Sequence, residues 1–200
     1  MKKTIAFDMD DVLAANAEGF VAFTNKRWGT SLTTQDYDEH WAKLWGVDHE
    51  EYMRRNDEFH SSGAVAHYRH YDEAAPVLTK FKESYRLVVV TSRRRIIEKE
   101  THAWLDKHFN GIFDEIHFAG IWDNHDQQAH RVTKGEICQQ IGADYLVDDQ
   151  LKHCMAAAGA GLQAVLYGDY SWNQTNTLPK DVTRAHNWQE VLDYFERIRG

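Results

Sequence analysis

The sequence predicts a three-layer α/β fold with a parallel sheet and a small helical insert after its first strand. From residue 75 onward, short apolar runs alternate with longer amphipathic patterns, which indicates strands joined by single helices. Such connections are right-handed crossovers that produce a parallel sheet with helices on both faces, a Rossmann-like arrangement. Residues 30–73 differ, because they are polar, rich in acids and histidine, and without any β-branched run. We expect short helices in that segment.

The N-terminal part begins with an apolar run, Ile5–Phe7, that predicts the first strand. An amphipathic pattern over residues 14–28 predicts the first helix, and Gly29 is suited to end it. Asp48 is a candidate N-cap in the polar stretch that follows.

The C-terminal part alternates strand and helix up to the last residues. The run Leu87–Val90 is apolar throughout, which is typical of a strand buried on both faces. Thr133 and Asn187 stand where N-caps would begin two of the helices. The predicted strands cover residues 86–90, 115–119, 145–147 and 163–166, and the predicted helices cover 76–84, 94–108, 134–141, 151–158 and 188–199.

Length and composition limit the protein's class. Two hundred residues suit one domain with a small insert, so we assign residues 1–14 and 75–200 to an α/β core and 15–74 to a helical cap. The formal charge of −8 argues against polymeric nucleic acid or an anionic membrane as a partner. No signal-peptide core and no apolar run of about 18 residues occurs, so we expect a cytoplasmic protein. The two cysteines lack Cys-x-x-Cys spacing, which supports neither a disulfide framework nor a zinc site. The oligomeric state is left open.

Three acids follow the first predicted strand within four residues: Asp8, Asp10 and Asp11. Two unit charges about 4 Å apart repel by ~4 kcal/mol at an effective dielectric constant of ~20. A positive group should therefore lie among them. Taken alone, the stretch is equally compatible with an acidic turn.

Three later segments place polar groups where they can meet these acids. Thr91 and Ser92 follow the apolar strand, Lys134 opens a helix, and Asp148-Asp149 ends another strand. Ligands of such sheets bind at the carboxyl ends of the strands, near the point where the strand order reverses. We therefore expect these segments to converge on Asp8. Individually they could be a helix cap, a surface charge and a turn.

The charges of this group predict a metal. Asp8, Asp10, Asp148 and Asp149 bring up to four negative charges against one Lys134, so a phosphate could hardly enter without a divalent cation. Hard oxygen ligands select Mg²⁺. We expect Asp8 and Asp149 to bind the ion directly, together with the backbone carbonyl of Asp10. Asp148 is expected to act through water or to hold Lys134.

The order acid-x-acid, Thr/Ser, Lys and paired acids resembles the four-motif signature of the haloacid dehalogenase superfamily of phosphohydrolases. The opening Asp-Met-Asp-Asp-Val-Leu-Ala is most similar to the 5'(3')-deoxyribonucleotidase group. That group usually carries Gly at the position of Asp11 and Pro at the position of Arg93. The superfamily places its small cap after the first strand, as expected here.

The resemblance implies a Mg²⁺-dependent phosphomonoesterase that works through an aspartyl phosphate on Asp8. Asp10 would protonate the leaving alcohol and then deprotonate the attacking water. The Thr91 hydroxyl and the Ser92 backbone amide would bind phosphate oxygens. Lys134 would stabilise the charge on Asp8 and on the phosphoryl group.

The cap is expected to close over the site and to contact the leaving group. Phe20, Trp41 and Trp45 could stack on a base, or they could pack the core of the cap. Arg93 could reach a second anionic group of the substrate, or it could belong to a solvated helix start. The histidine pairs of the sequence, His67 with His70 and His125 with His130, are assigned no metal role because further ligands are missing.

Three functions remain open at this stage. We favour a small phosphorylated metabolite as substrate, specifically a nucleoside monophosphate. A sugar phosphate or another small phosphate ester would require the same chemistry. A non-catalytic, receiver-like domain also uses acids, Thr/Ser and Lys around magnesium, but there the acid pair ends the first strand and the phosphorylated acid lies on a later one. The order in this sequence is the reverse, which favours the hydrolase.

Overall fold

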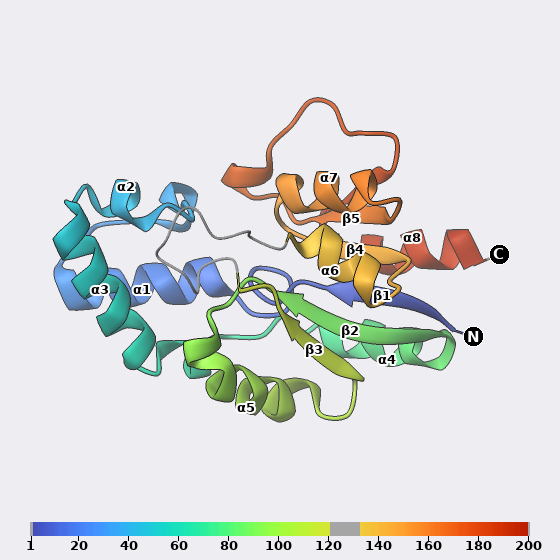
Figure 1. Ribbon diagram of the computed structural model, residues 1–200, viewed down its shortest axis with the longest axis horizontal. Helices are drawn as coiled ribbons and strands as arrows, with labels where there is room; N and C mark the ends of the chain where they lie inside the picture. The colour runs from blue at the N-terminus through green and yellow to red at the C-terminus, as the bar shows by residue number, and fades with distance from the viewer. Residues whose placement is uncertain (1, 121–132, 200) are drawn as a thin grey trace.

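The computed structural model describes residues 2–120 and 133–199, which form one six-stranded sheet (Figure 1). Its strand order is β3-β2-β1-β4-β5-β6, and every neighbouring pair is parallel. The order reverses between β1 and β4, which makes the carboxyl ends of these two strands the expected ligand-binding edge. The strands are β1 Lys3–Phe7, β2 Tyr85–Thr91, β3 Glu115–Phe118, β4 Tyr145–Asp148, β5 Gln163–Tyr167 and β6 Val182–Ala185.

Helices cover both faces of the sheet, which confirms the predicted three layers. Successive residues of a buried strand point to opposite faces, so Phe7 packs in one hydrophobic cluster and its neighbour Ala6 in the other. The first cluster includes residues of α4 (Ala74–Ser84), α5 (Glu98–Phe109) and α8 (Trp188–Arg199). The second includes residues of α6 (Lys134–Gln140) and α7 (Leu151–Gly159), which lie above the sheet in Figure 1.

One strand was not predicted. The residues of β6, Val-Thr-Arg-Ala, pair with β5 at the edge of the sheet. Only its end residues Val182 and Ala185 are buried, and Arg184 interrupts any apolar run. A strand this short at a half-exposed edge leaves too weak a hydrophobic pattern to be found in the sequence.

Residues 15–74, which we call the cap segment, contain helices and no β-strand, and all of them are described. They form α1 (Asn16–Trp28), α2 (Trp41–Trp45), α3 (His49–Ser61) and the 3₁₀ turns η1 (Thr34–Asp36) and η2 (Ala64–His67). Gly29 ends α1 with a φ of 67°, and the Asp48 carboxylate accepts the Glu51 N–H at 2.9 Å as the N-cap of α3. The three helices of this segment lie beyond the carboxyl ends of the strands (Figure 1).

The cap segment is held together by an aromatic core around Phe20. The ring centroid of Phe20 lies 4.5 Å from that of Trp41, 5.4 Å from Phe59 and 5.7 Å from Trp45. Such ring pairs each stabilise a core by about 0.5–1.5 kcal/mol beyond the area they bury. Phe20 is fully buried, so its side chain is committed to this packing.

Among the described residues, no helix has both the length and the apolar character needed to span a membrane. Both cysteines, Cys138 and Cys154, are buried free thiols.

Candidate active site

Asp8 lies at the carboxyl edge of the sheet because strand pairing continues one residue past β1. Its N–H donates to the Val147 carbonyl of β4 at 2.8 Å, which places the Asp8 carboxylate beside the end of β4. The Oδ1 atom of Asp8 accepts the Met9 N–H at 2.6 Å. Asp8 is 5% exposed, so its charge must be compensated within the protein.

Lys134 supplies that compensation. Thr133 caps α6 in a capping box with Glu136, which fixes the helix start and directs the Lys134 side chain to the sheet edge. Its Nζ lies 2.7 Å from Asp8 Oδ2 and 2.8 Å from Asp148 Oδ2. Burial lowers the pKa of Lys134, but the two carboxylates outweigh this effect and hold the pKa above its ordinary value. Asp148 therefore holds Lys134, which is one of the two roles expected for it from the sequence.

Three buried carboxylates, those of Asp8, Asp148 and Asp149, have oxygen atoms within 4.8 Å of one another. Burial, followed by the charges of Asp148 and Asp8, raises the pKa of Asp149 well above its ordinary value. A single lysine leaves this cluster with excess negative charge. The oxygen donor set and the uncompensated charge fit a hard divalent cation, and Asp8 and Asp149 lie close enough to share one.

Burial also raises the pKa of Asp8, to about 6, although Lys134 opposes the shift. The pKa of Asp11 rises to about 8 for the same reason, with the Ala17 backbone N–H opposing it. A cation bound beside these groups would favour their ionised forms.

Asp11 occupies a backbone conformation that explains why glycine is usual at this position. Its φ of 56° is positive, and no other non-glycine residue in the described parts of the chain has a positive φ. Asp and Asn tolerate this left-handed region better than most residues. The Asp11 carboxylate also accepts the Ala17 N–H at 3.0 Å and the Asn16 Nδ2–H at 3.4 Å, which attaches the start of α1 to the loop after β1.

Asp10 is bound by Arg93. The guanidinium contacts both carboxylate oxygens, with Nη2 2.6 Å from Oδ1 and Nε 3.0 Å from Oδ2. Arg93 lines the cavity described below, but its guanidinium is engaged by Asp10. That Arg93 reaches a second anionic group of the substrate stays a prediction.

The two phosphate-binding candidates after β2 differ in their surroundings. Thr91 is fully buried, and its Oγ1 accepts the Arg93 N–H at 3.1 Å. Ser92 lines the cavity, and its buried Oγ has no hydrogen-bond partner among the described residues. A buried hydroxyl without a partner is costly in a folded protein, so Ser92 Oγ is a free group at which a ligand oxygen can bind.

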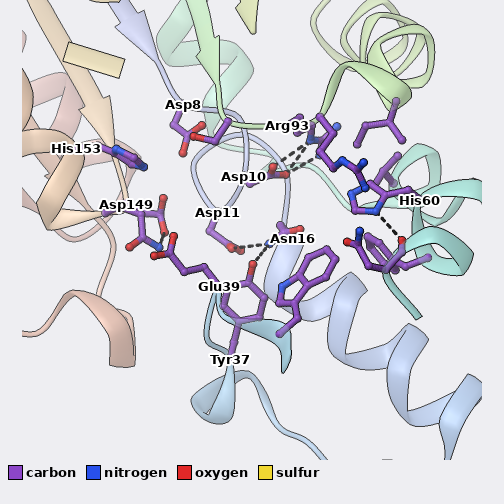
Figure 2. A pocket seen from close by; sticks show the side chains of 18 of the residues that line it. Asp8, Asp10, Asp11, Asn16, Tyr37, Glu39, His60, Arg93, Asp149 and His153 are labelled. Atoms are coloured by element: carbon purple, nitrogen blue, oxygen red, sulfur yellow. Dashed lines mark hydrogen bonds and ion pairs between the residues drawn. The ribbon is translucent and has the colours of Figure 1, made fainter. Parts of the chain in front are cut away.

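A cavity of about 370 Å³ joins these acids to the cap segment (Figure 2). This volume lies within the roughly 300–1,000 Å³ of small-molecule sites. Of the three aromatic residues predicted to contact a base, Trp41 lines the cavity, whereas Phe20 and Trp45 pack behind it in the aromatic core. The cavity lining includes Asp8, Asp10, Ser92, Lys134 and Asp149 from the core and Trp41, Tyr52, Phe59 and His60 from the cap segment.

Two further groups line the cavity opposite the acids. His60 Nδ1 lies 2.7 Å from the Asn56 carbonyl, and since a carbonyl only accepts, Nδ1 carries the proton. Burial and nearby Arg94 lower the pKa of His60 to about 4, so the ring is neutral at pH 7 and Nε2 is an acceptor. Arg94 Nε and Nη1 are buried without a hydrogen bond among the described residues, and Asp57 Oδ1 lies 3.9 Å from Nη1.

Several residues of this site had not been singled out from the sequence. His153 lines the cavity beside Asp149 (Figure 2), and burial lowers its pKa to about 3. Its position four residues after Asp149, in the first turn of α7, was a usable signal. No comparable signal marks His60 or Trp172, whose indole Nε1 lies 2.6 Å from Asp149 Oδ2. The predictions for His125 and His130 lie outside the described residues.

Comparison with known proteins agrees with this geometry. The sequence model of the family described as 5' nucleotidase, deoxy (pyrimidine), cytosolic type C protein matches residues 2–199. The chain belongs to this 5'-nucleotidase family. A 5'-nucleotidase is a phosphoric monoester hydrolase, which is the enzyme class that the motifs predicted, and the fold is that of haloacid dehalogenase-like hydrolases.

Individual relatives of this 5'-nucleotidase family member are distant in sequence. The YqfW protein of Bacillus subtilis (strain 168), named as a candidate nucleotidase, is 25% identical over 197 residues, covering 95% of this chain and 92% of its own. The haloacid dehalogenase-like hydrolase SP0104 of Streptococcus pneumoniae has the same fold, with a TM-score of 0.71, 16% identity and coverage of 97% and 98% of the two chains. The HAD-hydrolase YfnB of Bacillus subtilis, solved bound to magnesium, aligns with a TM-score of 0.65 at 13% identity, covering 96% and 98%.

Proposed function

We propose that this protein is a Mg²⁺-dependent phosphomonoesterase that hydrolyses nucleoside monophosphates through an aspartyl phosphate on Asp8. The observation that carries the proposal is the cluster at the cavity floor. There the Asp8 carboxylate is held 2.7 Å from Lys134 Nζ, and the oxygen atoms of Asp8, Asp148 and Asp149 lie within 4.8 Å of one another. A buried carboxylate beside a cation, at the end of a cavity, suits attack on a phosphoryl group.

Each residue has a defined part in this reaction. Asp8 attacks phosphorus, and the bond to the leaving alcohol breaks as Asp10 gives that alcohol a proton. A water then loses a proton to Asp10 and attacks the phosphoryl group, which releases inorganic phosphate and regenerates the Asp8 carboxylate. Lys134 and Ser92 Oγ stabilise the oxygens of the phosphoryl group. Magnesium, held by Asp8, Asp149 and the Asp10 carbonyl, would neutralise phosphate charge when bound.

The leaving group contacts the cap side of the cavity. Trp41 contributes an aromatic ring to the cavity lining, and this ring stacks on that of His60 with centroids 5.6 Å apart. Arg94 offers hydrogen-bond donors and His60 Nε2 an acceptor. A nucleobase combines a flat ring with polar edge atoms, so these groups suit it better than they suit a sugar alone. The description of the matching family supports the same substrate class.

The test is a panel of 5'- and 3'-nucleoside monophosphates, in ribose and deoxyribose form, together with sugar phosphates, each incubated with and without Mg²⁺. We expect Mg²⁺-dependent phosphate release that is fastest for a nucleotide. Asp8→Asn should lower the rate about a thousandfold or more, and mass spectrometry of the wild-type protein during turnover should detect a phosphoryl group on Asp8. Fastest release from a sugar phosphate would assign the substrate to that class, and release no greater than with Asp8→Asn would refute the proposal.

A further inference from the structure

The carboxylate of Asp149 is fixed by donors on one of its two oxygens. Oδ2 accepts the Trp172 indole N–H at 2.6 Å and the Gln150 Nε2–H at 3.2 Å. Among the hydrogen bonds between described residues, Oδ1 accepts none. Asp149 is 3% exposed, so a donor at this depth meets little competition from bulk water.

Trp172 is itself held rigidly. It lies in the 3₁₀ turn η4 (Ser171–Asn173) after β5, and its ring stacks on Tyr170 with centroids 4.6 Å apart and planes at 2°. Tyr170 OH donates to the Asp11 carbonyl at 2.8 Å, which ties the pair to the loop after β1. Trp172 also packs against Tyr37 of the cap segment in a T-shaped arrangement, with ring centroids 5.1 Å apart.

An indole N–H is a donor only, so its partner oxygen must be an acceptor facing it. The hydrogen bond is short, at 2.6 Å, and it restrains rotation of the Asp149 carboxylate. Rotation would exchange the positions of the two oxygens. Groups that orient a ligand in this way typically change metal affinity 10–100-fold when removed.

We propose that Trp172 is a positioning residue for the cation site: its indole N–H holds Oδ2 of Asp149 and thereby directs Oδ1 to the ion. The inference rests on the proposed function in so far as it assumes that Asp149 binds Mg²⁺. Trp172 does not line the cavity, so its effect is on the ion and not on direct contact with substrate.

The experiment measures Mg²⁺ binding by calorimetry in the absence of substrate. Trp172→Phe keeps an aromatic ring but removes the N–H donor together with part of the indole, and we expect the Kd for Mg²⁺ to rise about 10–100-fold. Trp28→Phe is the matched control, because it removes an indole N–H that points at Glu58 Oε2 at 3.4 Å in the cap segment; its Kd should equal that of the wild type. At saturating Mg²⁺, kcat of Trp172→Phe should recover toward the wild-type value, which a general loss of structure would not allow.

The outcomes separate the two proposals. Wild-type and Trp172→Phe proteins that bind Mg²⁺ with equal Kd overturn the role of Trp172 and leave the proposed function intact. A wild-type protein that binds no Mg²⁺ refutes the metal dependence and the role of Trp172 together. If Trp172→Phe does not fold, a crystal structure of the wild type with Mg²⁺ decides: Oδ1 on the ion with Oδ2 on the indole supports the inference, and an indole detached from Asp149 overturns it.

Discussion

Arg93 binds Asp10 through both carboxylate oxygens, and both residues line the cavity that contains the acid cluster. The Arg93 side chain is 3% exposed and that of Asp10 is 27% exposed, so the buried guanidinium holds a carboxylate that still reaches the cavity. A bidentate guanidinium fixes the plane of a carboxylate as well as its position. The arginine where the deoxyribonucleotidase group usually carries proline thus restrains the residue proposed as acid and base.

The first prediction concerns this pair. Arg93→Lys keeps the charge but cannot make two parallel hydrogen bonds, so we expect kcat to fall about tenfold through misplacement of Asp10. Asp10→Asn should cost about 10²–10⁴-fold. In the double variant, the losses in kcat of the two substitutions should not add, because each acts through the same carboxylate. Steady-state kinetics of the single and double variants test this, and fully additive losses would show that Arg93 acts elsewhere.

The second prediction concerns stability. Lys134→Ala removes the cation between Asp8 and Asp148 and leaves buried carboxylates unpaired, so the free energy of unfolding without Mg²⁺ should fall by about 3–5 kcal/mol. Lys152→Ala is the control, since Lys152 is half-exposed and pairs with Glu39; it should change stability by less than about 1 kcal/mol. Urea unfolding followed by circular dichroism measures both, and equal losses would contradict the central role of Lys134.

The third prediction concerns pH. Folding raises the pKa of Asp8 from 3.8 to about 6 and that of Asp11 from 3.8 to about 8. Between the unfolded and the folded pKa of each group, the folded chain therefore binds more protons than the unfolded chain. The resulting stability is fully present below about pH 4 and is lost as pH rises through 6 and then 8. Each group contributes a slope of at most about 1.4 kcal/mol per pH unit.

Urea unfolding across this pH range without Mg²⁺ should therefore show stability that falls as pH rises. Asp11→Asn removes one titrating group while keeping an oxygen acceptor and a side chain that tolerates positive φ, so it should flatten the decline above pH 6. Saturating Mg²⁺ should also flatten it, because the ion stabilises the folded state more as the carboxylates ionise. An unchanged slope in Asp11→Asn would mean that Asp11 is already ionised near neutral pH.

The fourth prediction concerns the substrate. Arg94→Met keeps much of the side-chain volume and removes the buried guanidinium, so kcat/KM for the best nucleotide should fall about 10–100-fold, as for loss of a charged hydrogen bond. Hydrolysis of p-nitrophenyl phosphate, whose leaving group lacks the edge atoms of a base, should change much less. Arg54→Met removes an exposed arginine of α3 and should leave both rates unaltered. Equal losses on both substrates would place Arg94 in the phosphate site instead.

The sequence was most informative where chemistry and local pattern coincide. Asp8, Thr91 and Asp148 each follow or end an apolar run, and parallel sheets gather such positions at one edge, so their convergence was predictable without coordinates. The caps Asp48 and Thr133 were likewise predictable, since a cap acts within one turn of its helix. Short-range rules were enough for these features.

The cap segment shows where such rules end. Phe20, Trp41 and Trp45 were equivalent candidates for stacking on a base, yet only Trp41 lines the cavity, because the orientation of α1 and α2 buries the other two. In the same way, Arg93 and Arg94 are neighbours in the chain, but Arg93 is bound by Asp10, whereas two buried nitrogen atoms of Arg94 make no hydrogen bond with the described residues. The different surroundings of these neighbouring residues depend on segments that are far away in the sequence.

By itself, the sequence determined the three-layer fold, the helical nature of residues 15–74 and the identity of the acid, hydroxyl and lysine groups at the sheet edge. Only the tertiary structure decided which donors hold Asp10 and Asp149, which aromatic ring faces the cavity, and that Val182–Ala185 completes the sheet. The physical reason is range: periodicity and capping are properties of neighbouring residues, whereas the contacts of Arg93 with Asp10 and of Trp172 with Asp149 exist only once distant segments have packed together.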